Sequence, residues 1–228
     1  MNVDRRTVGI AMACVLSAAA LATAREAPPA AASDESVSPA QALERLHAGN
    51  EAFRHGLVST NHLAESWRSS LAGGQHPFAI ILSCADSRVP PEHVFAQGLG
   101  DLFTVRVAGN VAEPATIASI EYAAAHLGAR LILVMGHTQC GAVKAALAKA
   151  DDTPAIKELV EAIRPAVETL PREATVDDVV RANVRRVHEQ LLKQSALLRG
   201  LVQDHKLELK DAVYDLATGE VQMLDAKE

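Results

Sequence analysis

The stretch that decides the fold is FAIILSCADSR, residues 78–88, in which an apolar run passes abruptly into side chains that can bind a metal. Its first five residues are all apolar, which is typical of a parallel strand buried on both faces. Cys84, Asp86 and Arg88 follow directly. Because open α/β sheets place their active sites just past the carboxyl ends of strands, these three residues are candidates for a functional site.

A second stretch, LILVMGHTQC at residues 131–140, repeats this arrangement later in the chain. Here a buried strand is expected to end just before His137 and Cys140. Between the two stretches, residues 102–107 read as another buried strand and residues 116–127 as a crossover helix. This alternation predicts right-handed βαβ units and an α/β fold with a mostly parallel central sheet flanked by helices.

Together the two stretches supply the donors of a tetrahedral metal site. Two thiols, one imidazole and one carboxylate match the types and the number of ligands that zinc takes. The candidate ligands are Cys84, Asp86, His137 and Cys140. Asp86 could ligate the metal directly, or pair with Arg88 and accept a hydrogen bond from a metal-bound water. The competing hypothesis is a disulfide between the two cysteines, which leaves the other residues without a role.

The composition is that of an ordinary globular chain, with 228 residues of which 49% are hydrophobic and 22% charged. The formal net charge of −6 offers no basic surface for nucleic acid. Aromatic residues make up only 3%, which leaves little for base stacking. We therefore expect no nucleic-acid partner.

The first 24 residues have the pattern of a secretory signal peptide. Arg5 and Arg6 precede an apolar run at residues 8–21, which also contains Cys14, and an Ala-Thr-Ala sequence follows. The run is shorter than the roughly 20 apolar residues of a membrane span, so we expect no stable span once the signal is removed. The paired arginines suggest the twin-arginine route. Residues 25–38 read as a flexible linker, and the protein is expected in the periplasm.

Two helices are expected before the first strand. Ser38 is a suitable N-cap and Pro39 a suitable first helical residue, so the folded domain is expected to begin there. Residues 61–72 are predicted to form a second helix, which Gly73 and Gly74 end.

The C-terminal third predicts a helix followed by a hairpin. Thr175 begins the helix with a capping box, and Gly200 is expected to end it. Residues 212–216 and 221–224 are expected to form an antiparallel hairpin at the edge of the sheet.

The metal motifs resemble those of the β-class carbonic anhydrases. The motifs are CADSR at 84–88 and HTQCG at 137–141, supported by GLGDLFTVRVAGN at 98–110 and IEYAAAHL at 120–127. The resemblance extends over roughly residues 39–224. It implies the fold of that family, with residues 39–228 as the catalytic domain.

The resemblance also implies one Zn²⁺ per chain and the reversible hydration of carbon dioxide to bicarbonate and a proton by a zinc-bound hydroxide. In that family the residues matching Cys84, His137 and Cys140 hold the metal. Water or the equivalent of Asp86 takes the fourth position, and the equivalent of Arg88 pairs with that aspartate and opens the site. Asp86 and Arg88 are thus the expected catalytic residues. Because two thiolates offset the charge of the ion, we expect activity that rises on the alkaline side.

Three further features follow from the resemblance. Residues matching the substrate pocket of the family are present as Gln75, Phe103 and Tyr122. The closed, allosteric subgroup usually has a tryptophan three residues before the first cysteine, and here Ile81 stands there, so the open subgroup is the better match. The family also implies a homodimer or homotetramer.

The sequence is also compatible with three other functions. A hydrolase for carbonyl sulfide or carbon disulfide would use the same ligands with a different access tunnel. A non-catalytic zinc-binding protein would keep Asp86 permanently on the metal. A disulfide-stapled binding domain would hold no metal at all.

Overall fold

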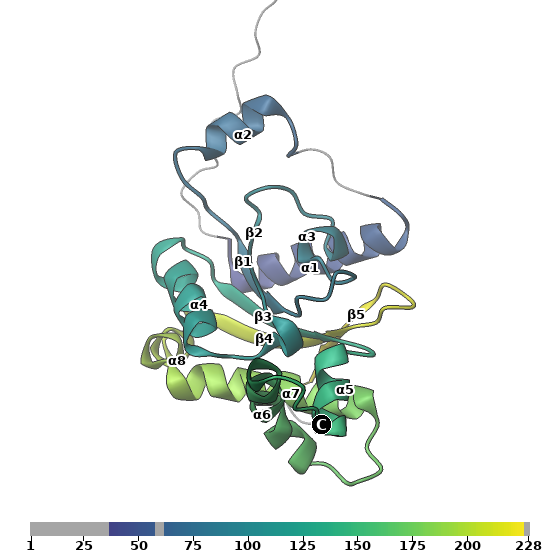
Figure 1. Ribbon diagram of the computed structural model, residues 1–228. Helices are drawn as coiled ribbons and strands as arrows, with labels where there is room; N and C mark the ends of the chain where they lie inside the picture. The colour runs from purple at the N-terminus through teal and green to yellow at the C-terminus, as the bar shows by residue number, and fades with distance from the viewer. Residues whose placement is uncertain (1–36, 58–61, 226–228) are drawn as a thin grey trace, which may run out of the picture. The chain divides into compact units, whose positions relative to one another are not determined.

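A computed structural model gives the structure of the protein over residues 37–57 and 62–225 (Figure 1). The predicted signal peptide, residues 1–24, and residues 25–36 of the predicted linker lie outside the described residues. In the described ranges, no helix has both the length and the apolar character needed to cross a membrane.

Five strands form one sheet in the order β2-β1-β3-β4-β5. The strands are β1 (Ala79–Ser83), β2 (Leu102–Arg106), β3 (Leu131–His137), β4 (Glu208–Tyr214) and β5 (Val221–Leu224). The first four strands are parallel to one another, and β5 is antiparallel to β4. The predicted α/β fold, with a mostly parallel sheet and an antiparallel hairpin at its C-terminal edge, is confirmed.

Helices cover both faces of this sheet (Figure 1). On one face lie α1 (Pro39–Arg54) and the short α3 (Pro91–Val94). On the other lie α4 (Pro114–His126), α7 (Val176–Gln194) and α8 (Ala196–Gln203). Two more helices, α5 (Gly141–Ala148) and α6 (Pro154–Glu168), pack with α7 in a third apolar cluster, which also contains Cys84 and Cys140.

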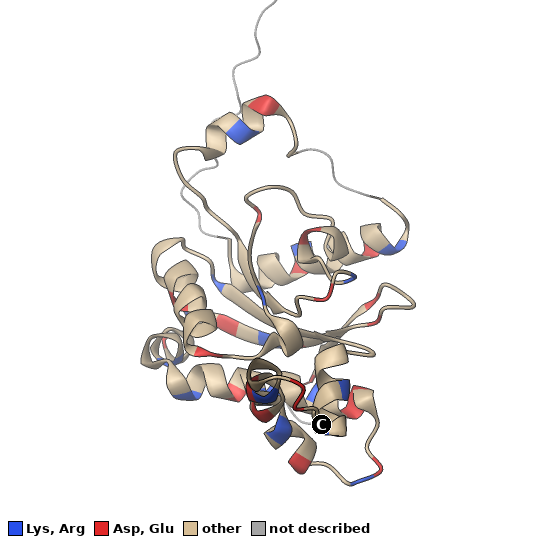
Figure 2. Cartoon of the chain, in the orientation of Figure 1, with Lys and Arg blue, Asp and Glu red and all other residues tan. Residues whose placement is uncertain are grey.

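The two central strands explain the uninterrupted apolar runs of the sequence. Every residue of β1 and β3 is buried. Ile80 and Leu82 pack in the cluster of α4, α7 and α8, whereas Ala79 and Ile81 pack under α1. Lys, Arg, Asp and Glu lie mainly on the helices and connections (Figure 2), and neither central strand contains one.

Some predicted elements differ from the structure. The strand expected at residues 102–107 is β2, which is only partly buried because, in the described part of the chain, it pairs with β1 alone. The helix expected at residues 61–72 is shorter, α2 (Glu65–Leu71), and buries none of its residues.

The prediction that Gly200 ends the long C-terminal helix is wrong. The helix α7 ends at Gln194, because Ser195 adopts an extended conformation with φ −103° and ψ 108°. The hydroxyl of Ser195 then accepts a hydrogen bond from the N–H of Leu198 and caps a separate helix, α8. Gly200 lies inside that helix. The predicted capping box of Thr175 at the start of α7 is confirmed.

Candidate metal centre

Two adjacent parallel strands bring the candidate ligands to the same end of the sheet. Ser83, the last residue of β1, is paired with Met135 of β3. Cys84 therefore leaves the sheet close to the level at which β3 ends in His137. Cys140 follows after a short turn, as the N-cap residue of α5. The parallel register of β1 and β3 thus brings Cys84 and His137 to one edge of the sheet, as the two sequence stretches predict.

Cys84, His137 and Cys140 form a compact buried group. Their ligand atoms all lie within 4.8 Å of one another. Both cysteines are free thiols, so the alternative of a disulfide between them is not found. Two thiols and one imidazole are donors that zinc and related transition metals prefer. The chemistry of the residues therefore fits a metal site.

The histidine is oriented for metal binding by the main chain. His137 Nδ1 lies 2.9 Å from the carbonyl oxygen of Thr138. Since a carbonyl can only accept a hydrogen bond, Nδ1 carries the proton and Nε2 keeps a free lone pair. Nε2 is buried and has no hydrogen-bond partner among the described residues. In metal-ligating histidines, the ring nitrogen that does not bind the metal usually donates such a hydrogen bond, and this bond fixes the tautomer.

The two thiols shift each other's pKa in opposite directions. A hydrogen bond from Cys140 lowers the pKa of Cys84, against the effect of burial. The same bond, together with burial, raises the pKa of Cys140. Gly109 supports the charge on Cys84, because its N–H lies 3.4 Å from Cys84 Sγ. Of the two thiols, Cys84 is therefore the one that loses its proton more readily.

Asp86 lies beside the three donors and is held by Arg88. Arg88 Nε and Nη2 donate to Asp86 Oδ1 and Oδ2 at 2.9 and 2.7 Å, and the backbone N–H of Arg88 donates to Oδ1 at 3.0 Å. The hydrogen bonds from Arg88 hold the pKa of the Asp86 carboxyl well below its usual range. Asp86 Oδ2 lies 3.9 Å from His137 Nε2. An ionised, fixed carboxylate thus faces the candidate ligands.

Two residues that were not predicted from the sequence, Arg106 and Asp177, hold the ligand loops. Arg106, at the end of β2, donates from Nε to the carbonyl of Cys84 at 3.2 Å and from Nη2 to that of Asp86 at 2.6 Å. Asp177, in the first turn of α7, accepts a hydrogen bond from the N–H of Gln139 at 3.0 Å. Gln139 stands between the second pair of ligands and has a left-handed φ of 58°. Both contacts join segments distant in sequence, and no local pattern signals them.

The predicted substrate residues are not gathered around the metal ligands of their own chain. Gln75 precedes β1 whereas Cys84 follows it, and five strand residues span about 16 Å. Phe103 is paired with Ile80, near the start of β1. Tyr122 lies on α4 and is 51% exposed. The roles of these three residues stay predictions.

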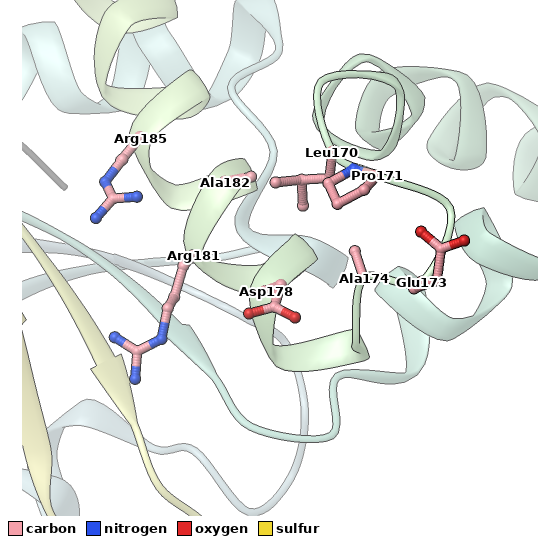
Figure 3. Close-up of a pocket in the computed structure, with 8 residues that line it drawn as sticks. All are labelled: Leu170, Pro171, Glu173, Ala174, Asp178, Arg181, Ala182 and Arg185. Carbon is pink, nitrogen blue, oxygen red and sulfur yellow. The ribbon is translucent and has the colours of Figure 1, made fainter.

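A separate cavity of about 410 Å³ lies between α7 and the segment that joins it to α6 (Figure 3). Arg181 and Arg185 of α7 line it, together with Glu173 and Asp178, so charges of both signs surround it. The three candidate ligands, all of them described residues, are not among its lining residues. The cavity is therefore distinct from the metal centre.

The protein is an α/β protein with an open sheet, and two cysteines and one histidine that could hold a metal ion lie at the carboxyl ends of its central strands. A family model described as carbonic anhydrase matches residues 79–221. The chain belongs to the β-class carbonic anhydrases.

Individual relatives agree with this assignment. Carbonic anhydrase 2 of Mycobacterium tuberculosis is 38% identical over 195 residues, which cover 82% of this chain and 94% of that protein. The β-carbonic anhydrase CafA of Aspergillus fumigatus is 28% identical, with a TM-score of 0.64 over 83% of this chain and 90% of that one. One structure from a study of two tetrameric β-carbonic anhydrases of Sordaria macrospora is 25% identical, with a TM-score of 0.64 over 82% and 95% of the two chains.

Proposed function

We propose that this protein catalyses the reversible hydration of carbon dioxide to bicarbonate and a proton, with one Zn²⁺ held by Cys84, His137 and Cys140. The observation that carries the proposal is the buried group of three ligand atoms within 4.8 Å of one another. The free lone pair of His137 Nε2 supports it, because a buried nitrogen without a partner is costly unless it binds something. Membership of the family supports the reaction.

Bound zinc can lower the pKa of a coordinated water from about 15.7 to about 7, which makes a nucleophile available at mild pH. The protein then orients the reactants. The carboxylate of Asp86 is fixed by two hydrogen bonds from Arg88. It would accept a hydrogen bond from the attacking hydroxide and so direct the lone pair of that oxygen toward the carbon of carbon dioxide. The thiolates of Cys84 and Cys140 offset the positive charge of the ion, so we expect activity to rise toward alkaline pH.

The same contacts favour catalysis over a closed, purely structural zinc site. A permanent fourth ligand from Asp86 requires that a carboxylate oxygen turn a lone pair toward the metal, and a two-point contact with Arg88 opposes such a turn. In the structure, Arg88 occupies both carboxylate oxygens. This arrangement supports the open form of the site.

Stopped-flow measurement of carbon dioxide hydration tests the proposal, at neutral and at alkaline pH, with zinc determined on the same sample. We expect one zinc per chain and turnover that rises with pH. Zinc without hydration at either pH would contradict the proposed reaction. Assays with carbonyl sulfide and carbon disulfide would then separate a related hydrolase from a non-catalytic zinc protein.

We also propose a homodimer or homotetramer in which a second copy completes the substrate pocket. Gln75, Phe103 and Tyr122 lie away from the ligands of their own chain, and Tyr122 is half exposed. A neighbouring copy can bring such residues to the metal centre. The tetrameric relatives from Sordaria support an assembly of this kind.

Mixed assemblies of two inactive variants test this arrangement. Gln75→Ala keeps the metal ligands, and Cys84→Ala keeps the pocket residue. If the pocket is shared, co-expression restores activity, because each mixed pair contains one site with intact parts from both chains. Mixed assemblies that stay inactive would contradict a shared pocket. Light scattering of the wild type gives the number of chains.

Export to the periplasm is proposed from residues 1–24 alone. The test is cell fractionation of the full chain, with Arg5→Lys combined with Arg6→Lys as the variant. Export by the twin-arginine route predicts a shortened periplasmic protein from the wild type and retention of the variant in the cytoplasm. A full-length cytoplasmic wild type would contradict export.

A further inference from the structure

We propose that Asn183 of α7 is a positioning residue for the metal centre, acting on Cys84 through the peptide of Gly109. The inference rests on the proposed metal binding at this site, and it extends the site to a helix that begins 36 residues after the last ligand by sequence.

Two hydrogen bonds in series connect the residues. Asn183 Nδ2 donates to the carbonyl oxygen of Gly109 at 2.9 Å. The N–H of the same glycine donates to Cys84 Sγ at 3.4 Å. Because a carbonyl only accepts, the first bond fixes which way the Asn183 amide points. The helix therefore holds the residue whose N–H meets the sulfur.

The backbone at Gly109 is confined on its other sides as well. Its φ of +64° lies in the left-handed region, which favours glycine. A Cβ at this position would lie 2.7 Å from Ile163 Cδ1 of α6 and 3.2 Å from Ala142 Cβ of α5. The backbone of Gly109 is thus enclosed by two helices and hydrogen-bonded to a third, so the direction of its N–H depends on all of them.

Packing alone does not explain an asparagine at this place. Asn183 is 1% exposed, and its helix neighbours Val180, Val184 and Val187 are buried apolar residues. Its Oδ1 has no hydrogen-bond partner among the described residues. A buried polar atom left in this state destabilises the folded protein, because its hydrogen bond to water is lost without replacement. A leucine of similar size would avoid that cost, but it could not donate a hydrogen bond to the carbonyl of Gly109.

The bond has a direct consequence for the sulfur. An N–H directed at a thiolate stabilises the negative charge and fixes the position of the sulfur. Without the contact, the sulfur donor is less well placed for the metal, and metal binding weakens. Loss of such outer-shell contacts typically costs 10–100-fold in metal affinity.

The matched pair of variants is Asn183→Leu and Asn50→Leu. Asn50 is also a buried asparagine, on α1 against the opposite face of the sheet. Its Nδ2 donates to the carbonyls of Val94 and Gly219 at 3.0 and 2.8 Å, and its Oδ1 accepts from the N–H of Val221 at 2.9 Å. Its replacement removes more hydrogen bonds than the replacement of Asn183, but none near the metal centre.

Three quantities are measured on the full chain: urea unfolding, zinc affinity by competition with a chromophoric chelator, and the sulfur-to-metal charge-transfer band of the Co²⁺-substituted protein. We expect Asn183→Leu to weaken zinc binding by about 10-fold or more and to shift the band. Asn50→Leu should lower stability and leave affinity and band unchanged. Asn183→Asp keeps the size but replaces the donor by an ionisable acceptor, and should reproduce the loss if the leucine variant does not fold.

Wild-type affinity and an unshifted band in both Asn183 variants would overturn the inference alone, as would an equal loss in Asn50→Leu. A wild-type protein that binds no zinc would overturn the proposed function, and this inference with it.

Discussion

Arg88 holds both carboxylate oxygens of Asp86, with Nε–Oδ1 and Nη2–Oδ2 distances of 2.9 and 2.7 Å. Such a two-point contact fixes the plane of the carboxylate as well as its position. Asp86 Oδ2 nevertheless lies only 3.9 Å from His137 Nε2. The arginine therefore keeps beside the metal centre a group that, once released, can turn toward it.

Replacement of Arg88 by glutamine should slow catalysis by about 10²-fold without removing the metal. The freed carboxylate loses its fixed direction, and a misplacement of about 1 Å costs about 10²-fold in rate. The ligands themselves are untouched, so we expect one zinc per chain in the variant. Stopped-flow hydration and zinc content on the same sample measure both effects.

The variant Asp86→Asn serves as the control for this pair, because it keeps the shape and removes the charged acceptor. If the two residues act as a unit, the double variant should be no slower than either single variant. Wild-type turnover in Arg88→Gln, or strictly additive losses, would count against the pairing.

Asp177 is expected to stabilise the loop between His137 and Cys140. Its Oδ1 accepts the N–H of Gln139 at 3.0 Å, at a residue with a left-handed backbone. Asp177→Ala removes that acceptor and should weaken zinc binding by about 10-fold, as outer-shell changes do. Asp177→Asn keeps an acceptor oxygen and should retain most of the affinity. Chelator competition distinguishes the two variants, and equal affinities would argue against this role.

Two glycines inside helices should respond to alanine in opposite directions. At Gly49 of α1, a Cβ would lie 1.8 Å from the carbonyl oxygen of Phe95, a backbone atom that cannot move aside. Gly49→Ala should therefore destabilise the fold by about 1–3 kcal/mol or more, although alanine is the better helix former. At Gly200 of α8, nothing lies within 4 Å of an added Cβ, so Gly200→Ala should stabilise by about 0.5–1 kcal/mol. Urea unfolding of both variants measures the difference, and the same sign in both would contradict it.

The predictable part of the molecule is the part with local patterns. The central strands are buried on both faces, so their apolar runs and the donors that follow them stand out in the sequence. The capping residues Ser38 and Thr175 likewise mark the starts of α1 and α7. These signals depend only on neighbours along the chain.

The missed parts depend on tertiary contacts or on exceptions to local rules. The helix α6 was not predicted, and it contains Pro165, a residue that as a rule ends a helix. Gly200 has the appearance of a helix stop, yet the break falls at Ser195. Asn183 and Arg106 donate hydrogen bonds to residues 74 and 22 positions away in the sequence. The residues next to them in the sequence give no signal of these contacts.

The start of α7, the helix that carries Asp177 and Asn183, should lose stability in acid through Asp178. The carboxylate of Asp178 accepts hydrogen bonds from Thr175 Oγ1 and from the backbone N–H of Thr175, at 2.6 and 2.8 Å. These bonds lower the pKa of Asp178 in the folded protein. The unfolded chain, with an ordinary aspartate pKa of about 3.9, therefore binds more protons in acid. Stability from this group is present above that pH and is lost as the pH falls through the lower folded value.

Asp178→Asn tests this assignment, because it keeps an acceptor oxygen but has no charge to lose. We expect the variant to unfold at lower urea than the wild type at neutral pH. The gap should narrow as the pH drops below about 4, where Asp178 binds a proton in the unfolded wild-type chain before it does so in the folded protein. Other carboxylates with lowered pKa values, such as Asp215, are present in both proteins and cancel in the comparison. Urea midpoints at neutral and acid pH measure the gap; a gap that stays constant with pH would show that the charge of Asp178 does not stabilise the cap.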